Sequence, residues 1–329
     1  MTAATVQELP RRVALTDRLA RHGFLLVLAL LFVGLSLATR AFFTLDNQMG
    51  MLHAMAPVVI IAAGMALVVM SGKLDISVGS IAFLPVAAGA LGIKYLSWHP
   101  LFAFSVSALT GGLLGAVNGF IIVVLRVNPL ITTLGTMIIF RGVALQLTDA
   151  NVIVLPDAVR HFGNLSAGPV YFDVIVAAGV LLACHQLHLR TPFGRQLTAI
   201  GNGDDVAARI GVPVARTVFL SFVLCGVLAA TGGVFAAMQV GSVTTFLGQG
   251  LEFTAVAVVV VGGISLFGGQ GSILGGVLLG ALTFEMIRNG LNHLGANPYS
   301  YRLVGGVVIF IAMYADALKR RSHNEPSGP

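Results

Sequence analysis

Charged residues are scarce in this chain of 329 residues: it carries 19 Lys and Arg, 13 Asp and Glu, and 57% hydrophobic residues. A soluble domain needs about 25% charged residues to cover its surface. Charged residues make up only 10% here, so most of the exterior must face lipid. The length accommodates on the order of ten membrane spans of about 20 residues each, and it leaves no room for a large soluble domain.

Lysine is rarer still, and its positions exclude one common type of nucleotide-binding site. The only lysines are Lys73, Lys94 and Lys319, and none completes the G-x-x-x-x-G-K-[ST] pattern of a phosphate-binding loop. Any ATP hydrolysis linked to this protein must therefore take place on another polypeptide.

Motifs for catalysis or metal binding are also missing. HExxH, CxxC and GxSxG patterns do not occur, so we expect no enzyme activity. His185 and His188 have a helical spacing, but no carboxylate lies nearby in sequence. The two cysteines, Cys184 and Cys225, lie in apolar stretches and do not predict a disulfide. We expect neither a metal nor a cofactor.

Long apolar runs account for most of the chain and predict an all-α membrane protein of about ten transmembrane helices. The runs are 24–41, 51–70, 78–97, 101–124, 129–148, 170–189, 216–239, 251–268, 272–291 and 300–318. With ten spans both termini lie on one side, which receives 13 of the 19 Lys and Arg residues. Because basic residues gather on the cytoplasmic side, this side is expected to be the cytoplasm of a bacterial inner membrane. The same rule explains the net charge of +6 without nucleic acid.

These expectations divide the chain into three parts. Residues 1–23 form a cytoplasmic N-terminal segment, 24–318 the transmembrane permease domain, and 319–329 a cytoplasmic tail. Within the membrane domain, three sets of glycines spaced four residues apart predict close helix packing, because small residues let backbones approach. The sets are Gly111, Gly115 and Gly119; Gly271 and Gly275; and Gly276 and Gly280.

A polar loop at about 191–216 contains the signals of a short cytoplasmic helix. Asn202 is placed to cap its start, and Asp204 and Asp205 put negative charge at its N-terminus. Arg209 falls in its last turn, while Gly211 and Pro213 end it. An isolated helix this short is unstable in water, so it either packs on its own bundle or docks onto a cytoplasmic partner. The expected coupling residues are Gly201, Asn202, Asp204, Asp205, Ala207, Arg209 and Gly211.

Four stretches resemble one transporter family in the same order along residues 50–315. Met70-Ser71-Gly72-Lys73-Leu74-Asp75-Ile76-Ser77-Val78-Gly79-Ser80 is similar to the "G-x-DLSVGS" signature of permease subunits from ribose/xylose/arabinose-type ATP-binding-cassette (ABC) sugar importers. Asn128–Met137, Thr191–Gly211 and Gly262–Ser272 are similar to further stretches of that family. Lys73 is a departure, since the family usually has glycine there.

The resemblance implies a ten-span fold and import of a monosaccharide or similar polyol. It also implies four kinds of contact: a second permease subunit, cytoplasmic ATPase subunits, a periplasmic binding protein and the surrounding lipid. The Asn-Pro-Leu variant at 128–130 also resembles permeases for autoinducer-2, so the solute stays open between a sugar and that signal.

Polar residues in or beside the spans are candidates for the solute route, because an ionisable group inside a membrane usually faces a cavity or a partner. The candidates are Asp75, Ser77, Asn118, Asn128, Thr132 and Thr133. For Asp75 the alternative is capping of the following helix, and for the others it is helix packing.

Four further charged residues have structural interpretations. Glu252 suits a helix N-terminus, and Glu285 with Arg288 forms an ion pair along one helical face. Arg141 is expected to extend outward to the headgroups.

A secondary transporter coupled to protons or sodium is the main alternative function. That class commonly has carboxylates at mid-membrane depth, whereas the acids here lie mostly at span ends.

Overall fold

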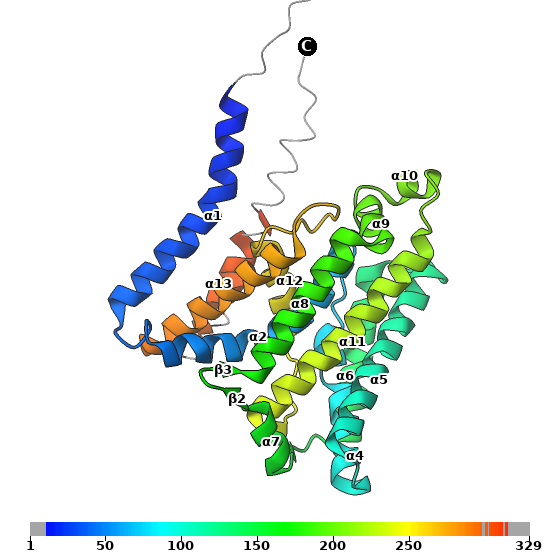
Figure 1. Ribbon diagram of the computed structural model, residues 1–329. Coiled ribbons are helices and arrows are strands. Elements are labelled where there is room, and N and C mark those ends of the chain that lie inside the picture. Colours follow the sequence, from blue (N-terminus) through cyan, green and yellow to red (C-terminus); the bar gives the residue numbers. More distant parts are fainter. Residues whose placement is uncertain (1–10, 298–299, 302, 312, 315–329) are drawn as a thin grey trace, which may run out of the picture.

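The protein is an all-helical bundle with four very short strands, as the sequence predicts (Figure 1). The computed structural model describes residues 11–297, 300–301, 303–311 and 313–314. The expected cytoplasmic tail, 319–329, lies outside the described residues.

The helices follow the apolar runs closely. Their bounds are α1 Arg11–Ala38, α2 Leu45–Met70, α3 Val78–Ile81, α4 Leu84–Leu96, α5 Pro100–Val123, α6 Pro129–Leu147, α7 Asp157–Gly163, α8 Phe172–Arg190, α9 Pro192–Gly201, α10 Asp204–Arg209, α11 Val214–Val240, α12 Leu251–Val261 and α13 Ile273–His293. Strand β1 (Ile153–Val154) pairs with β4 (Ser242–Val243), and β2 (Ser166–Ala167) pairs with β3 (Val170–Tyr171), both antiparallel. In Figure 1, α9 and α10 lie at one extremity of the bundle, and α7 lies at another together with the β2–β3 hairpin.

Six stretches of the described chain are long and apolar enough to cross a membrane: α2, α3 with α4, α5, α6, α8 and α11. The stretch Leu25–Ala38 of α1 and helix α12 are shorter apolar helices. In the run predicted at 300–318, residues 303–311 are helical. A multi-pass membrane bundle is therefore confirmed, while ten spans stay a prediction.

Two predicted spans are not continuous helices. The run 78–97 is broken between α3 and α4, because Pro85 lacks a backbone N–H and lies in the first turn of α4. The run 251–268 ends as a helix at Val261. Beyond it, Gly263, Gly268 and Gly269 have positive φ angles of 94°, 85° and 71°, a left-handed conformation that a right-handed helix cannot contain.

Helix α2 forms the centre of the bundle. All twelve residues from Val59 to Met70 are buried, so this half of the helix is covered on every side. A helix that is apolar all round belongs in such a position, and α8, α9, α11, α12 and α13 lie around it.

The predicted glycine packing holds for two of the three sets. Along α5, Gly111 and Gly115 face the backbone of α11 so closely that a Cβ atom would collide with it, and Gly119 lies against Phe219 of α11. Gly280 of α13 approaches the α12 backbone in the same way, and Gly276 lies against the Ile264 side chain just beyond α12. The pair Gly271 and Gly275 was predicted wrongly, because Gly271 precedes α13 in a left-handed conformation and Gly275 faces only its own first turn.

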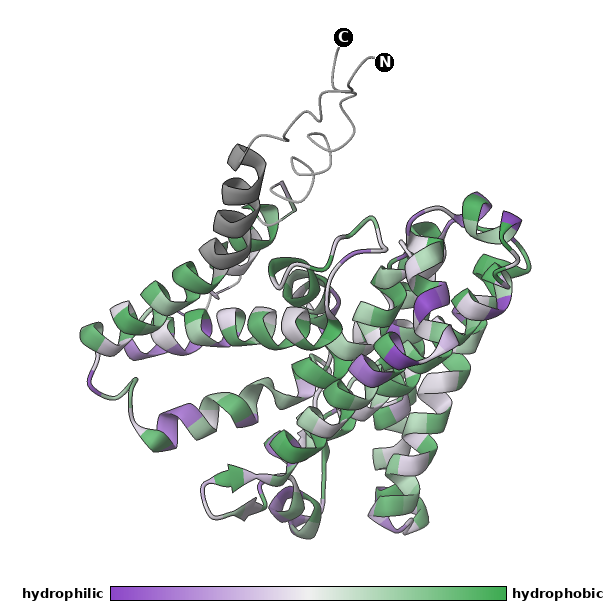
Figure 2. Ribbon diagram, turned by 45° about the horizontal axis from the view of Figure 1, so that its top comes forward, coloured by the Kyte–Doolittle hydropathy of each residue, from purple (hydrophilic) through white to green (hydrophobic). Residues whose placement is uncertain are grey.

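The outer surface of the bundle is apolar. Along α6, large hydrophobic side chains such as Ile131, Ile138 and Ile139 are exposed, and α5 exposes Leu109 and Leu113 in the same manner. Figure 2 shows hydrophobic residues along most of the long helices. Such extended apolar surfaces on hydrogen-bonded helices are suited to lipid.

Candidate functional site

The loop predicted at 191–216 contains two helices rather than one. Thr191 caps α9, its hydroxyl accepting a hydrogen bond from the Gly194 backbone N–H, and Pro192 follows at the first helical position. The sequence prediction missed α9, although these two residues form a regular start signal.

A short helix, α10, lies at the residues where the sequence predicts one. Asp204 and Asp205 lie in its first turn, Arg209 in its last turn, and Ala207 is buried against the bundle. Gly211 has a φ angle of +84° just beyond the helix, which is the conformation a helix stop requires.

The predicted role of Asn202 as the cap of α10 is wrong. Asn202 instead ends α9, and its side-chain amide donates to the Thr198 carbonyl at 2.9 Å. Gly203 occupies the capping position of α10 with a φ angle of +152° and makes no side-chain bond. Because α9 extends to Gly201, Asn202 lies at the end of that helix, and Gly203 is the residue that precedes α10.

The outer face of α10 is apolar as well as charged. The side chains of Val206 and Ile210 are 64% and 72% exposed and lie one turn apart on the same face. Asp205 and Arg209 are exposed beside them. Two aliphatic side chains thus lie uncovered on this face, one in α10 and one directly after its last residue.

The solute-route candidates Asp75, Ser77 and Asn118 come together in the interior. All three are buried. Asp75 Oδ1 accepts hydrogen bonds from the Ser77 backbone N–H at 3.0 Å and from its hydroxyl at 2.6 Å. The Asn118 amide donates to the Ser77 hydroxyl oxygen at 2.8 Å.

This buried cluster keeps unused hydrogen-bonding capacity. Among the described residues, neither Asp75 Oδ2 nor Asn118 Oδ1 has a partner. Buried polar atoms usually have hydrogen-bond partners, and these two oxygens are able to accept from a further donor. Asp75 does bond the start of α3, as the capping alternative predicted, but only with one of its two oxygens.

The other three candidates do not join this cluster. Asn128 caps α6 at an exposed position, accepting from the Leu130 N–H at 2.9 Å. The hydroxyl of Thr133 donates to the Pro129 carbonyl of its own helix at 2.9 Å. Thr132 is buried, and its hydroxyl has no partner in the described structure.

The prediction for Arg141 is wrong, because its side chain turns inward. The guanidinium donates to the backbone carbonyls of Thr245 at 3.2 Å and Leu247 at 3.0 Å, and it lies 5.3 Å from the centre of the Phe83 ring. Arg141 thus holds the segment between β4 and α12. Glu252, in the first turn of α12 as predicted, accepts from the Gly250 N–H at 3.2 Å.

The predicted pair Glu285–Arg288 is confirmed, with 2.8 Å between its closest atoms. Both cysteines are free and buried. His188 contacts the Thr198 hydroxyl at 3.0 Å, a contact between α8 and α9.

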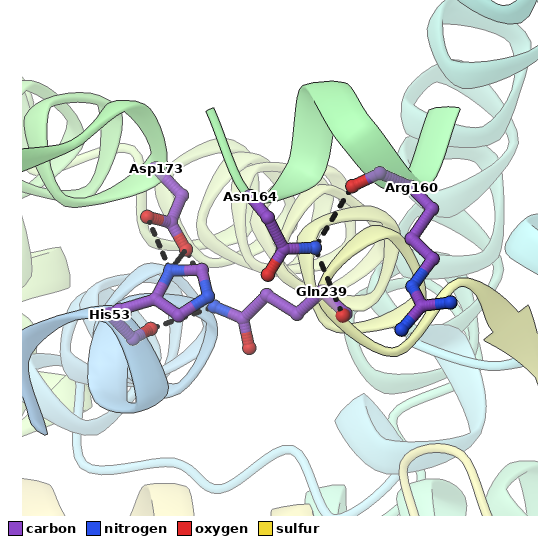
Figure 3. A network of polar contacts seen from close by, with 5 residues as sticks. All are labelled: His53, Arg160, Asn164, Asp173 and Gln239. Atoms are coloured by element: carbon purple, nitrogen blue, oxygen red, sulfur yellow. Dashed lines mark hydrogen bonds and ion pairs between the residues drawn. The ribbon is translucent and has the colours of Figure 1, made fainter. Parts of the chain in front are cut away.

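A polar network near α7 was not predicted from the sequence. Buried Asp173 in α8 accepts from His53 Nδ1 of α2 at 2.9–3.0 Å and from the Gln239 side chain of α11 at 2.5 Å (Figure 3). Asn164 adds donors to the carbonyls of Arg160 and Gln239. An aspartate at the start of an apolar run was the available signal, but its partners lie 66 and 120 residues away in sequence.

Comparison with known proteins agrees with this architecture. Residues 47–313 match the model of a family described as branched-chain amino acid transport system / permease component. The chain is 34% identical to the ribose import permease protein RbsC of Escherichia coli over 97% of this chain and 100% of that protein. It is 34% identical to the autoinducer 2 import system permease protein LsrC of Klebsiella pneumoniae, over 89% and 85% respectively.

A further relative is the L-arabinose transport system permease protein AraH of Escherichia coli, 32% identical over 92% of both chains. No solved structure matches the chain.

An apolar helical bundle with buried polar clusters and a short exposed helix defines a polytopic membrane transport protein. The chain belongs to the family of transport-system permease components that its sequence matches. It is therefore a translocation subunit and not an enzyme.

Proposed function

We propose that the protein is the transmembrane subunit of an ABC importer that moves a monosaccharide or similar small polyol across the bacterial inner membrane. The ribose and arabinose permeases among its relatives support this solute class. Because one relative is an autoinducer-2 import permease, autoinducer-2 is the alternative solute. ATP hydrolysis is assigned to a separate ATPase, and solute capture to a periplasmic binding protein.

The exposed face of α10 is the observation that carries this proposal. Val206 and Ile210 are uncovered, whereas Ala207 anchors the helix to the bundle. A helix of six residues is not stable in isolation. We therefore infer that a partner protein covers its exposed face. We assign that partner role to the cytoplasmic ATPase, with Asp205 and Arg209 as its polar contacts.

The proposed membrane topology has ten spans within residues 24–318 and both termini in the cytoplasm. Helix α10 would then lie on the cytoplasmic side and α7 on the periplasmic side, which is consistent with their positions at different extremities of the bundle (Figure 1). Two permease subunits, identical or related, would enclose one solute route.

The buried cluster of Asp75, Ser77 and Asn118, with Thr132, is the proposed polar part of that route. Its unpaired acceptors are suited to hydroxyl donors such as those of a sugar. Because the cluster is fully buried, this conformation would be closed to solute, and ATPase-driven movement would open it.

Co-purification from native membranes tests the docking surface. The wild-type chain should bring down an ATPase, and Asp205→Arg with Val206→Asp should weaken that association about tenfold or more, as expected for loss of an interface anchor. Asp157→Arg is the matched control, since Asp157 is an exposed acid in the first turn of α7 at another extremity of the bundle. Equal retention of the ATPase by all three chains would refute docking through α10.

A second experiment separates the importer from an ion-coupled transporter and identifies the solute. The cognate binding protein should bind one member of a panel of ribose, arabinose, autoinducer-2 and leucine, measured by calorimetry. Uptake of that compound into proteoliposomes should need ATP, the ATPase and the binding protein. Uptake by the permease alone, driven by a proton or sodium gradient, would instead establish the secondary transporter.

A further inference from the structure

The segment that links α2 to α3, residues 71–77, carries two charges with different surroundings. Asp75 lies in the buried cluster, whereas Lys73 is partly buried and contacts Asp204 of α10.

Lys73 is bound to the first turn of α10. Its ammonium nitrogen lies 3.0 Å from Asp204 Oδ2 and 3.1 Å from Oδ1, and it also donates to the Ser71 carbonyl at 3.3 Å. The side chain of Lys73 is only 13% exposed, while that of Asp204 is 53% exposed. An ammonium group withdrawn from water needs acceptors, and Asp204 supplies the charged one.

This contact divides the two acids of α10 between two roles. Asp204 faces inward to Lys73, whereas no side-chain bond within the described structure engages Asp205 on the exposed face. Asp204 is thus suited to fix the position of α10 on its own subunit, and Asp205 stays available to a partner.

Backbone packing joins the same segments beside the ion pair. Gly201 is enclosed by the Met70 carbonyl and by Gly269, leaving no room for a Cβ atom. The Gly269 N–H donates to the Met70 carbonyl at 3.0 Å. The α9–α10 turn therefore rests directly on the end of α2, and a displacement of α10 acts on the beginning of the 71–77 segment.

The other end of this segment is held in the bundle interior. Asp75 receives two hydrogen bonds from Ser77, and Ser77 receives one from Asn118 of α5. Only Leu74 separates Lys73 from Asp75. A displacement of Lys73 would therefore have to pass through only two residues to reach the buried cluster.

We infer that Lys73 is a positioning residue that, through its ion pair with Asp204, transmits movement of α10 to the Asp75–Ser77–Asn118 cluster. This inference rests on the proposed function, in which an ATPase moves α10. It adds the specific contact by which that movement reaches the proposed solute route.

The test measures movement of the segment without needing a known solute. In a chain with Cys184→Ala and Cys225→Ala, the change Leu74→Cys places one partly exposed thiol between Lys73 and Asp75. Maleimide labelling of this thiol is timed in the purified complex with its ATPase, with and without ATP plus vanadate. Trapped nucleotide should change the labelling rate about fivefold, within the range of coupling between contacting residues.

Variants of the ion pair should alter this nucleotide response selectively. Lys73→Met keeps the aliphatic stem but removes the charge, and should reduce the response to less than about twofold. Lys73→Arg should retain it, and the exchange of Lys73→Asp with Asp204→Lys should restore part of it. Lys94→Met is the matched control, because Lys94 lies at the end of α4 and contacts only Tyr95 among the described aromatic rings.

The outcomes distinguish the two proposals. A full nucleotide response with Lys73→Met, or no response with Lys73 intact, would overturn this inference while leaving a co-purified ATPase in place. An equal loss of the nucleotide response in the Met, Arg and exchanged variants would also overturn it. The response would then depend on the packing of the lysine side chain and not on its ion pair with Asp204. Absence of any ATPase from the wild-type complex would refute the proposed function, and this inference with it.

Discussion

The side chain of Gln239 donates a hydrogen bond of 2.7 Å to the backbone carbonyl of His53, and Pro57 explains why that carbonyl is available. In a helix the carbonyl of residue 53 accepts from the N–H of residue 57, which proline lacks. Gln239 of α11 supplies the missing donor and also donates to Asp173. A proline in α2 is thus compensated by a side chain from another helix.

This relationship predicts a measurable coupling between positions 57 and 239. Gln239→Leu should lower the free energy of unfolding by about 1–3 kcal/mol, because it leaves the His53 carbonyl and one Asp173 oxygen with a donor less. Adding Pro57→Ala restores a helical N–H to the carbonyl, so the double variant should lose less than Gln239→Leu alone. Thermal unfolding of the detergent-solubilised protein measures all three variants against wild type.

Gln146→Leu serves as the control, since Gln146 is an exposed residue of α6. It should change stability little. Strictly additive effects of Pro57→Ala and Gln239→Leu would contradict the compensation, because two residues that share one hydrogen-bonding group must show an interaction energy.

The contact between α5 and α11 gives a second prediction. Gly115 lies against the backbone carbonyl of Phe222, and a Cβ atom there would collide with it. Gly115→Ala should therefore force the helices apart and destabilise the bundle by about 1–3 kcal/mol.

Gly179→Ala provides the comparison, because the structure places no described atom within 4 Å of a Cβ at that position of α8. Alanine is favoured over glycine in a helix by about 1 kcal/mol, so this change should be neutral or stabilising. Melting temperatures measured side by side test the difference, and equal melting temperatures would show that α5 and α11 do not pack through this glycine face.

Features that depend on neighbouring residues were predictable from the sequence. The ends of α10 follow from Asp204, Asp205, Arg209 and Gly211, all within eight positions. The Glu285–Arg288 pair follows from a separation of three residues. Local rules of helix termini and helix faces suffice in these cases.

Features that depend on distant residues were missed or misassigned. Arg141 binds carbonyls 104 and 106 residues away, and nothing near it in sequence indicates that they would be free. The Lys73–Asp204 contact spans 131 residues. Long apolar runs also concealed two interruptions, at α3–α4 and after α12, because hydropathy is insensitive to backbone conformation. Of the solute-route candidates, Asp75, Ser77 and Asn118 meet in the interior, whereas Asn128 and Thr133 bond within their own helix.

The third prediction concerns the segment that Arg141 holds. The two hydrogen bonds to Thr245 and Leu247 use separate nitrogens of the planar guanidinium. Lysine keeps the charge but offers a single point of attachment. Arg141→Lys should therefore loosen residues 244–250 while leaving the surrounding helices intact. Hydrogen–deuterium exchange of this segment should accelerate about tenfold, the factor that corresponds to a loss of about 1.4 kcal/mol.

Arg126→Lys is the matched substitution, because Arg126 is exposed between α5 and α6. Its exchange pattern at 244–250 should equal that of the wild type. If Arg141→Lys also leaves exchange at 244–250 unchanged, the segment must be held by the β1–β4 pairing and by Glu252 rather than by Arg141. If exchange instead accelerates throughout α6 and α12, Arg141 stabilises the bundle as a whole, and its role is not confined to this segment.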